Sequence, residues 1–450
     1  MAAALGVLVS CGSVKSGEEV VAASRDSKVV VAYVTSWSEV MPDPQYMTHI
    51  NYAFGHVNES FNGVKIDNEE RLRQIVDLRK QKPELKVLLS IGGWGSGRFS
   101  EMAANDEYRR AFVADCARVV KEFALDGIDI DWEYPTSSMA NISSSPDDTE
   151  NFTLLMQDIR AAIGNEKELT LATVASARYI DFKAILPSVD FVNIMAYDMA
   201  SAPKHHSALY PSGHSGDITS DGAVTAHLKA GVPPSKLVMG MPFYGRGGDG
   251  YPSFQDYNKV GNTDTQYTEK WDEVAQVPYL ADKNDTLVFG FENPRSLAIK
   301  CQYILDKDLL GGMYWDYSGD NEQGDLRRTV AENLLGKPHK AKVLVLTERG
   351  GQHGGFTDAG LRWLAAEGAK GNFSITEINN ARNITEAYLS QFSLVIQLDF
   401  PPYTWPKEAE DAFVKYIEEG HGGWIGFHHA TLLGEFDGYP MWQWFSDFMG

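Results

Sequence analysis

Three acidic residues alternate with apolar residues within the stretch Leu125–Pro135, at positions Asp129, Asp131 and Glu133. On a β-strand this spacing places the three carboxyl groups on one face, about 6.6 Å apart along the chain. Carboxyl groups this close cannot all ionise without repulsion, so at least one should keep its proton near neutral pH. A glutamic acid in that state can serve as a general acid, and Glu133 is the candidate.

Two other interpretations of these acids are a solvated acidic strand and a calcium site. The sequence shows neither the spacing of a calcium loop nor partner ligands. We therefore assign no metal ligand and expect no cofactor, and we interpret the stretch as an acid–base catalytic centre.

Eight short apolar runs can supply the scaffold for these acids. They alternate with helix-like stretches, which is typical of a parallel sheet covered by helices, and several are almost entirely Val, Ile, Leu or Met. Such a series predicts an α/β fold of the (β/α)8, or TIM, barrel type, with its active site at the carboxyl ends of the strands. The runs are Val29–Val34, His49–Phe54, Lys86–Ile91, Gly127–Asp131, Leu169–Val174, Phe191–Met195, Leu237–Met241 and Gly312–Trp315.

The pattern changes near residue 338, after a Gly/Pro/Lys segment that is typical of a linker. We expect a signal or lipobox segment and polar linker over 1–26, the barrel over 27–337, and a second domain over 338–450. In the second domain, a clear helical pattern at Lys407–Glu419 and the strands around it predict a smaller doubly wound, flavodoxin-like α/β fold. We expect this domain to be truncated. Its predicted strands are Lys342–Leu346, Phe373–Ile378, Leu394–Leu398 and Trp424–Phe427.

The acidic stretch resembles the D-x-x-D-x-D-x-E signature of glycoside hydrolase family 18, with Asp126 at its first position and Glu133 at its last. Other segments resemble that family in the expected order, although each alone could be core packing. Together they indicate a chitinase-like catalytic domain over essentially all of 27–337. The segments are Ser90–Trp94 on the third strand, Met195–Asp198 on the sixth, Gly240–Arg246 on the seventh and Trp315 on the eighth.

The resemblance implies retaining catalysis in which the substrate's own 2-acetamido oxygen attacks the anomeric carbon. Glu133 would protonate the glycosidic oxygen and later act as base toward water, while Asp131 would orient the acetamido N–H and stabilise the oxazolinium ion. Asp129 would tune Asp131, and Tyr197, assisted by Asp198, would aim the acetamido oxygen. The residues expected to line the sugar groove are Tyr33, Phe54, Gly93, Trp94, Tyr134, Met195, Tyr244, Arg246 and Trp315.

Chitin or chitooligosaccharides, with β-1,4-linked N-acetylglucosamine, are the substrates that the resemblance favours. The alternatives are an endo-β-N-acetylglucosaminidase acting on N-glycans and a silent chitin-binding lectin, although lectin relatives typically lose the acid that Glu133 supplies. Only 64 residues separate Arg246 from Gly311. We expect this connection to be too short for an extra α+β insertion, which predicts a shallow, open cleft.

The formal charge of −21 disfavours nucleic acid and anionic membrane surfaces as partners, whereas a neutral polysaccharide is compatible with it. No protein partner is inferable. Cys11 follows an apolar run in a segment that resembles a bacterial lipobox, although the usual basic n-region is missing. We expect a lipid on Cys11 to anchor a secreted, cell-surface or periplasmic lipoprotein; export without a lipid, or a cytoplasmic protein, is the alternative. Cys116 and Cys301 are expected to be buried thiols.

The second domain resembles, with lower specificity, the ThuA-like (trehalose utilisation) domains related to class I glutamine amidotransferases. The matching pieces are Thr347 with His353 and the segment Gly422–Thr431. His428 stands where an amidotransferase has its nucleophilic cysteine, so we do not expect amidotransferase activity. His353 and His428 are either ligands or sugar contacts or, as the preferred interpretation, ordinary structural residues.

Overall fold

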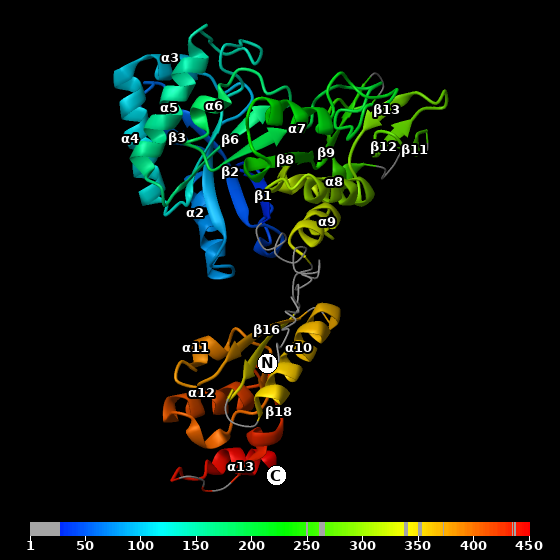
Figure 1. The fold of residues 1–450 in the computed structure, drawn as a ribbon. Coiled ribbons are helices and arrows are strands. Elements are labelled where there is room, and N and C mark those ends of the chain that lie inside the picture. The colour runs from blue at the N-terminus through cyan, green and yellow to red at the C-terminus, as the bar shows by residue number, and fades with distance from the viewer. Residues whose placement is uncertain are drawn as a thin grey trace, which may run out of the picture. The chain divides into compact units, whose positions relative to one another are not determined.

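The chain forms two compact units that divide between Gly336 and Lys337, near the boundary that the sequence predicts. The structure, a computed structural model (Figure 1), describes residues 28–248, 251–260, 266–336, 341–349, 353–371, 373–433, 435 and 438–450. The predicted signal segment and Cys11 lie outside the described residues.

The first unit is a closed barrel of eight parallel strands, as the sequence predicts. The strands pair in the order β1-β14-β8-β7-β6-β5-β4-β2, and β2 pairs with β1 to close the ring. A short antiparallel strand, β3 (Val64–Ile66), extends β2. The barrel strands are β1 (Val29–Thr35), β2 (His49–Val57), β4 (Lys86–Gly92), β5 (Gly127–Asp131), β6 (Glu168–Val174), β7 (Phe191–Met195), β8 (Leu237–Pro242) and β14 (Gly311–Trp315).

Helices follow the strands along the chain and pack around the barrel (Figure 1). Side-chain caps help to set where several of them begin. Asn105 accepts hydrogen bonds from two backbone N–H groups at the start of α4, and Asn293 forms a capping box at the start of α8. The helices are α2 (Glu69–Val76), α3 (Phe99–Ala104), α4 (Asp106–Glu122), α5 (Asp148–Ile163), α6 (Phe182–Ile185), α7 (Ser220–Lys229), α8 (Pro294–Asp306) and α9 (Asp325–Leu334).

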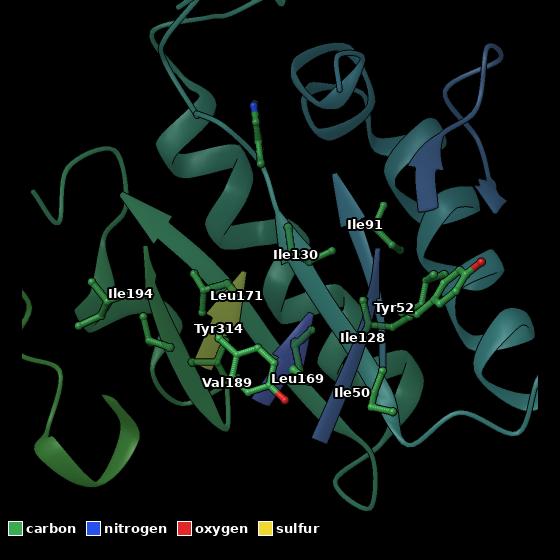
Figure 2. Packing of buried hydrophobic residues seen from close by; sticks show 14 of the residues in the cluster. Ile50, Tyr52, Ile91, Ile128, Ile130, Leu169, Leu171, Val189, Ile194 and Tyr314 are labelled. Atoms are coloured by element: carbon green, nitrogen blue, oxygen red, sulfur yellow. The ribbon is translucent and has the colours of Figure 1, made fainter. Parts of the chain in front are cut away.

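Strand β5 shows how sequence alternation sorts side chains between the two faces of the barrel wall. Ile128 and Ile130 are fully buried in the hydrophobic core between strands and helices (Figure 2). Ile130 pairs in register with Ile91 of β4 and Leu171 of β6. Because side chains alternate along a strand, this packing fixes the acids of β5 on the inner face.

The expectation of a short connection without an insertion is wrong. Between β8 and α8 the chain forms a five-stranded antiparallel sheet in the order β10-β9-β13-β12-β11. Its strands have only two to five residues, which is why so short a stretch holds a whole sheet. They are β9 (Tyr244–Gly247), β10 (Gln255–Asp256), β11 (Thr268–Asp272), β12 (Val277–Ala281) and β13 (Leu287–Gly290).

The second unit is a parallel sheet in the order β16-β15-β17-β18, with apolar clusters on both faces. Leu364 of α10 packs with one face, and Phe413 of α12 with Phe445 of α13 with the other. This is the predicted doubly wound arrangement. The elements are β15 (Ala341–Leu346), α10 (Gly354–Gly371), β16 (Phe373–Ile378), α11 (Glu386–Leu389), β17 (Leu394–Gln397), α12 (Lys407–Glu418), β18 (Gly423–Gly426) and α13 (Gln443–Met449).

Cys116 on α4 and Cys301 on α8 are free and buried, as predicted. Burial raises the pKa of both thiols, which keeps them in the neutral form. Among the described residues, no helix is long and apolar enough to cross a membrane.

The core of the barrel wall gives a first prediction. Leu169 is fully buried, whereas Leu228 on α7 of the same unit is 37% exposed. We expect Leu169→Ala to lower the free energy of unfolding by about 2–5 kcal/mol, because it removes packed methyl groups and leaves a cavity. Leu228→Ala should cost distinctly less in the same urea titration. Equal losses would contradict the assigned packing.

Candidate active site

A pocket of about 690 Å³ opens where the barrel strands end. Strands β1, β2, β6, β7 and β14 contribute lining residues, as do β9 of the antiparallel sheet and the segments that follow β4 and β5. The lining includes every site residue predicted from the sequence except Asp129 and Gly93. The sequence therefore identified most of the wall of one pocket.

Asp129 lies below the pocket, fully buried inside the barrel. Its carboxylate accepts hydrogen bonds from four neighbouring strands. The donors are Tyr33 Oη at 2.9 Å, Ser90 Oγ at 2.8 Å, Thr170 Oγ1 at 2.5 Å and Asn193 Nδ2 at 3.3 Å. Burial raises the pKa of Asp129, and these four donors oppose that rise because they stabilise the charged form.

Asp131 lies next along the strand and reaches the pocket. Burial first, then the charges of Glu133 and Asp129, raise its pKa well above the ordinary value. Its Oδ1 is buried and has no hydrogen-bond partner among the described residues. A buried acceptor without a partner is costly, so this atom is available to a donor on a bound ligand.

Glu133 comes directly after β5 and lines the pocket. Burial raises its pKa to about 7, the charge of Asp198 adds to the rise, and a hydrogen bond from Tyr134 Oη at 3.0 Å opposes it. This agrees with the expectation that one carboxyl of the stretch holds a proton near neutral pH. The cause is chiefly burial, and the charge that adds to it is that of Asp198, which lies outside the stretch.

Asp126, the first acid of the motif, lies at the opposite end of β5, away from the pocket lining. Its Oδ2 accepts hydrogen bonds from the guanidinium of Arg79 and from the backbone N–H of Val87 at 2.8 Å. It ties the beginning of β5 to its surroundings, so its contribution is structural.

Tyr197 lies beside the acids at the end of β7. Burial, followed by the charges of Asp131 and Asp198, raises its pKa well above the ordinary value, so the phenol keeps its proton as a donor. Gly240 of β8 makes room for the ring, because a Cβ there would come within 2.8 Å of Tyr197 Cε1. The glycine of the seventh-strand segment is thus explained by packing.

Asp198 is held by a bidentate ion pair. Arg246 Nε donates to Oδ1 at 2.7 Å and Arg246 Nη2 to Oδ2 at 2.6 Å, and His206 Nδ1 lies 3.4 Å from Oδ1. Burial acts to raise the pKa of Asp198, but Arg246 and His206 hold it below its ordinary value. Arg246 lines the pocket as expected, yet no pattern in the sequence indicates that its guanidinium pairs with Asp198.

The glycines of the third-strand segment were expected to bring the backbone close to a sugar. In the structure they make room for other parts of the protein. A Cβ on Gly92 would lie 1.9 Å from the carbonyl oxygen of Asp131, and a Cβ on Gly93 would lie 2.6 Å from the ring of Phe54. Both also have positive φ angles. They let the protein pack against itself, and Gly93 is not among the residues that line this pocket, so its contact with a sugar stays a prediction.

Aromatic rings cover the pocket around Trp315, whose ring stacks on Phe54 at 5.5 Å and lies 5.6 Å from Tyr33. Trp94 is 62% exposed, and exposed aromatic faces of this kind suit sugar rings. Sequence reasoning missed lining residues that lie outside the recognised segments, two of them (Ala172 and Val174) on strand β6 and the others in loops. These are Trp37, Met139, Ala172, Val174, Ala175, Ser176, Arg178, Tyr179, Met199, Ile218 and Phe254.

The antiparallel sheet adds a wall that the predicted shallow cleft lacks. Tyr244 and Arg246 of β9 line the pocket, and Phe254, just before β10, stacks on Tyr244 at 4.7 Å. Trp37, which follows β1, could have been noticed as an aromatic residue at a strand end. Phe254 carries no such signal, since the strand that follows it, β10, is only two residues long.

An eight-stranded barrel with stacked acids under an aromatic-lined pocket defines a barrel glycoside hydrolase. Residues 29–320 match the model of the glycosyl hydrolases family 18, and the chain belongs to that family. Residues 342–450 match the trehalose utilisation (ThuA) family.

Relatives agree with this placement. Chitinase A1 of Niallia circulans is 29% identical over 409 residues, and the match covers 67% of this chain but 58% of that relative, so the chain spans less than two thirds of its length. Chitotriosidase-1 of Mus musculus is 31% identical over 66% of this chain and 74% of the relative. A solved family 18 N-acetylglucosaminidase from Paenibacillus barengoltzii is 32% identical with a TM-score of 0.63, covering 68% of this chain and 100% of that one.

The raised pKa of Glu133 predicts a pH-dependent effect on stability. Its folded-state pKa of about 7 lies above the ordinary value of 4.5, so stability is lost as pH rises between these values. Glu133→Gln removes that loss. The melting temperature of the variant, relative to wild type, should therefore be higher at about pH 8 than at about pH 4. Glu59→Gln, on an exposed residue, is the control, and an identical pH dependence for both variants would contradict the burial argument.

Proposed function

We propose that the barrel hydrolyses β-1,4-linked N-acetylglucosamine in chitin or chitooligosaccharides, with retention and through an oxazolinium intermediate. One observation carries the proposal. The acids of the pocket lining are Asp131, Glu133 and Asp198, and both carboxylate oxygens of Asp198 accept hydrogen bonds from Arg246. Because the two remaining acids share one strand end, no free carboxylate among the described residues of the lining faces Glu133 as a nucleophile. The substrate's acetamido group fills that role.

The proposed reaction begins when Glu133 donates its proton to the glycosidic oxygen. The acetamido carbonyl oxygen then forms a bond to the anomeric carbon as the bond from that carbon to the leaving oxygen breaks. The product is an alcohol and a cationic oxazolinium ion. The unpaired Oδ1 of Asp131 accepts a hydrogen bond from the acetamido N–H. The positive charge of the oxazolinium ion stabilises the ionised form of this carboxyl.

In the second step the ionised Glu133 takes a proton from water, whose oxygen attacks the anomeric carbon and opens the oxazolinium ring. Tyr197, a protonated donor beside the acids, aims the acetamido carbonyl oxygen. The ion pair with Arg246 keeps Asp198 charged and fixed beside this site, so Asp198 acts on the position and pKa of its neighbours.

Chitin is the first choice because curated relatives of this barrel are named chitinases. One structural neighbour is named an N-acetylglucosaminidase. Release of single sugars from the end of a chitooligosaccharide is therefore a variant of the same proposed chemistry. The N-glycan endoglycosidase and the chitin-binding lectin are the outcomes that the first experiment must separate. Attachment to a membrane through Cys11 stays a prediction.

The decisive experiment is product analysis by mass spectrometry after incubation with chitohexaose and, separately, with a high-mannose glycoprotein. Wild type should release shorter chitooligomers, and Glu133→Gln should be slower by about 10²–10⁴-fold, the usual contribution of a general acid. Glu59→Gln is the matched control and should retain wild-type rates.

Release of N-glycans with chitohexaose left intact would replace the chitinase by an endoglycosidase. Binding of chitohexaose without cleavage would indicate a lectin. Equal rates for Glu133→Gln and wild type would remove Glu133 from the mechanism, whatever the substrate.

The pH profile tests the protonation state directly. Only protonated Glu133 can donate in the first step, so kcat/KM on chitohexaose should fall as pH rises through about 7. Initial rates across the neutral range measure this limb. A kcat/KM that stays constant or rises well above pH 7 would show that the group whose proton is needed is not Glu133.

A further inference from the structure

Three histidines from two separate segments of the second unit converge on one point. His353 immediately precedes α10, and His428 and His429 follow β18. One ring nitrogen from each lies within 4.8 Å of the others. The ring centroids are 4.5 Å apart for His353 and His428, 4.4 Å for His353 and His429, and 4.4 Å for His428 and His429.

The cluster occupies the place where an open parallel sheet binds ligands. In the order β16-β15-β17-β18 the chain turns to one side after β15 and to the other side to reach β17. The crevice beyond the carboxyl ends of strands at such a switch point is the usual ligand site of doubly wound folds. His353 lies in the connection after β15 and the other two histidines follow β18, so all three belong to this edge.

The hydrogen bonds of the three imidazoles leave ring nitrogens available to a ligand. Within the described part of the chain, no hydrogen bond is recorded for the ring nitrogens of His353 or His428, while His429 Nδ1 lies 3.1 Å from Glu348 Oε2. If Nδ1–H donates to this carboxylate, Nε2 of His429 carries the free lone pair. A carboxylate behind a histidine is the usual support of a metal-binding imidazole, because it fixes the tautomer and the ring orientation.

Glu348 is itself held in place. Its backbone N–H donates to Asp399 Oδ1 at 2.8 Å, and Thr357 Oγ1 of α10 donates to Asp399 Oδ2 at 2.6 Å. Asp399 is fully buried. The chain of contacts from buried Asp399 through Glu348 to His429 gives the cluster a rigid base.

The outer side of the cluster is open. His428 is exposed and His353 and His429 are partly exposed. His428 also has a φ of 49°, the left-handed region that non-glycine residues rarely adopt, at the strand-to-helix turn where related enzymes present a reactive side chain. Side chains from two segments thus meet at a surface that solvent, and hence a metal ion, can reach.

We propose that His353, His428 and His429 bind one zinc ion, with a coordination position left open to water. Three neutral imidazoles form a donor set that zinc accepts, and a site with three protein ligands and one open position is the arrangement of catalytic zinc centres. Zn–N bonds of about 2.1 Å in a tetrahedral site place the nitrogens about 3.4 Å apart. The three nitrogens, now within 4.8 Å of one another, must therefore move closer together when the ion binds.

Equilibrium dialysis of the 450-residue chain against zinc sulfate, followed by elemental analysis, tests the proposal. Wild type should bind one zinc that His353→Ala and His428→Ala each lose. His421→Ala is the matched control, because His421 is exposed in the same unit and pairs with the exposed Glu419, outside the cluster. This control should bind zinc like wild type.

A positioning variant separates metal binding from simple unfolding. Glu348→Gln keeps all three imidazoles, so it should keep the stoichiometry while the affinity for zinc falls by about 10- to 100-fold. Zinc should also raise the melting temperature of wild type and His421→Ala but not of His428→Ala, because a ligand stabilises only a folded state that binds it. Far-ultraviolet circular dichroism without metal checks that each variant is folded.

Cobalt gives a spectroscopic signature that a structural role for the histidines would not produce. Co²⁺ bound by three imidazoles and water has visible absorption bands. Adding zinc should displace the cobalt ion and abolish these bands. A wild-type chain that binds no zinc, or folded His353→Ala and His428→Ala variants that bind it like wild type, would overturn the proposal. Hydrolysis of chitohexaose by the barrel is measured independently, so the two proposals fail separately.

Discussion

The buried carboxylate of Asp129 is the interaction on which the barrel site depends. A carboxylate inside a barrel needs compensating donors, and Tyr33, Ser90, Thr170 and Asn193 supply them from β1, β4, β6 and β7. The group therefore ties β5 to four other strands. Asp131 and Glu133 follow at fixed spacing, and their height above this anchor is set by the rise of the strand.

Because the anchored acids are buried, their pKa values differ from those of solvated carboxyl groups. Burial raises the pKa of Asp131 and of Glu133, so the free enzyme holds a proton where a solvated carboxylate would lose it. The pKa of Asp198 shifts in the opposite direction, because Arg246 holds it low despite burial. Groups of one chemical type thus receive different protonation states from their partners, which is how one pocket contains both an acid and fixed negative charge.

Much of the scaffold could be predicted because period-two and strand–helix patterns are local. All eight barrel strands and the four strands of the second sheet lie where the apolar runs are. The antiparallel sheet was not predicted because the connection was judged by its length, and strands of two to five residues let a whole sheet fit into it. The packing of Gly93 against the Phe54 ring could not be predicted, because a glycine that receives a neighbouring ring looks, in sequence, like one that receives a ligand.

The sequence by itself determined the barrel, the family, and the identity and order of the acids on β5, because strand geometry converts spacing directly into a shared face. Only the tertiary structure decided that burial raises the pKa of Asp131 and of Glu133, that Arg246 pairs with Asp198 from 48 residues away, and that His353 meets His428 and His429. These properties depend on distances between segments far apart in the chain and on exclusion of water. Neither is encoded in local spacing.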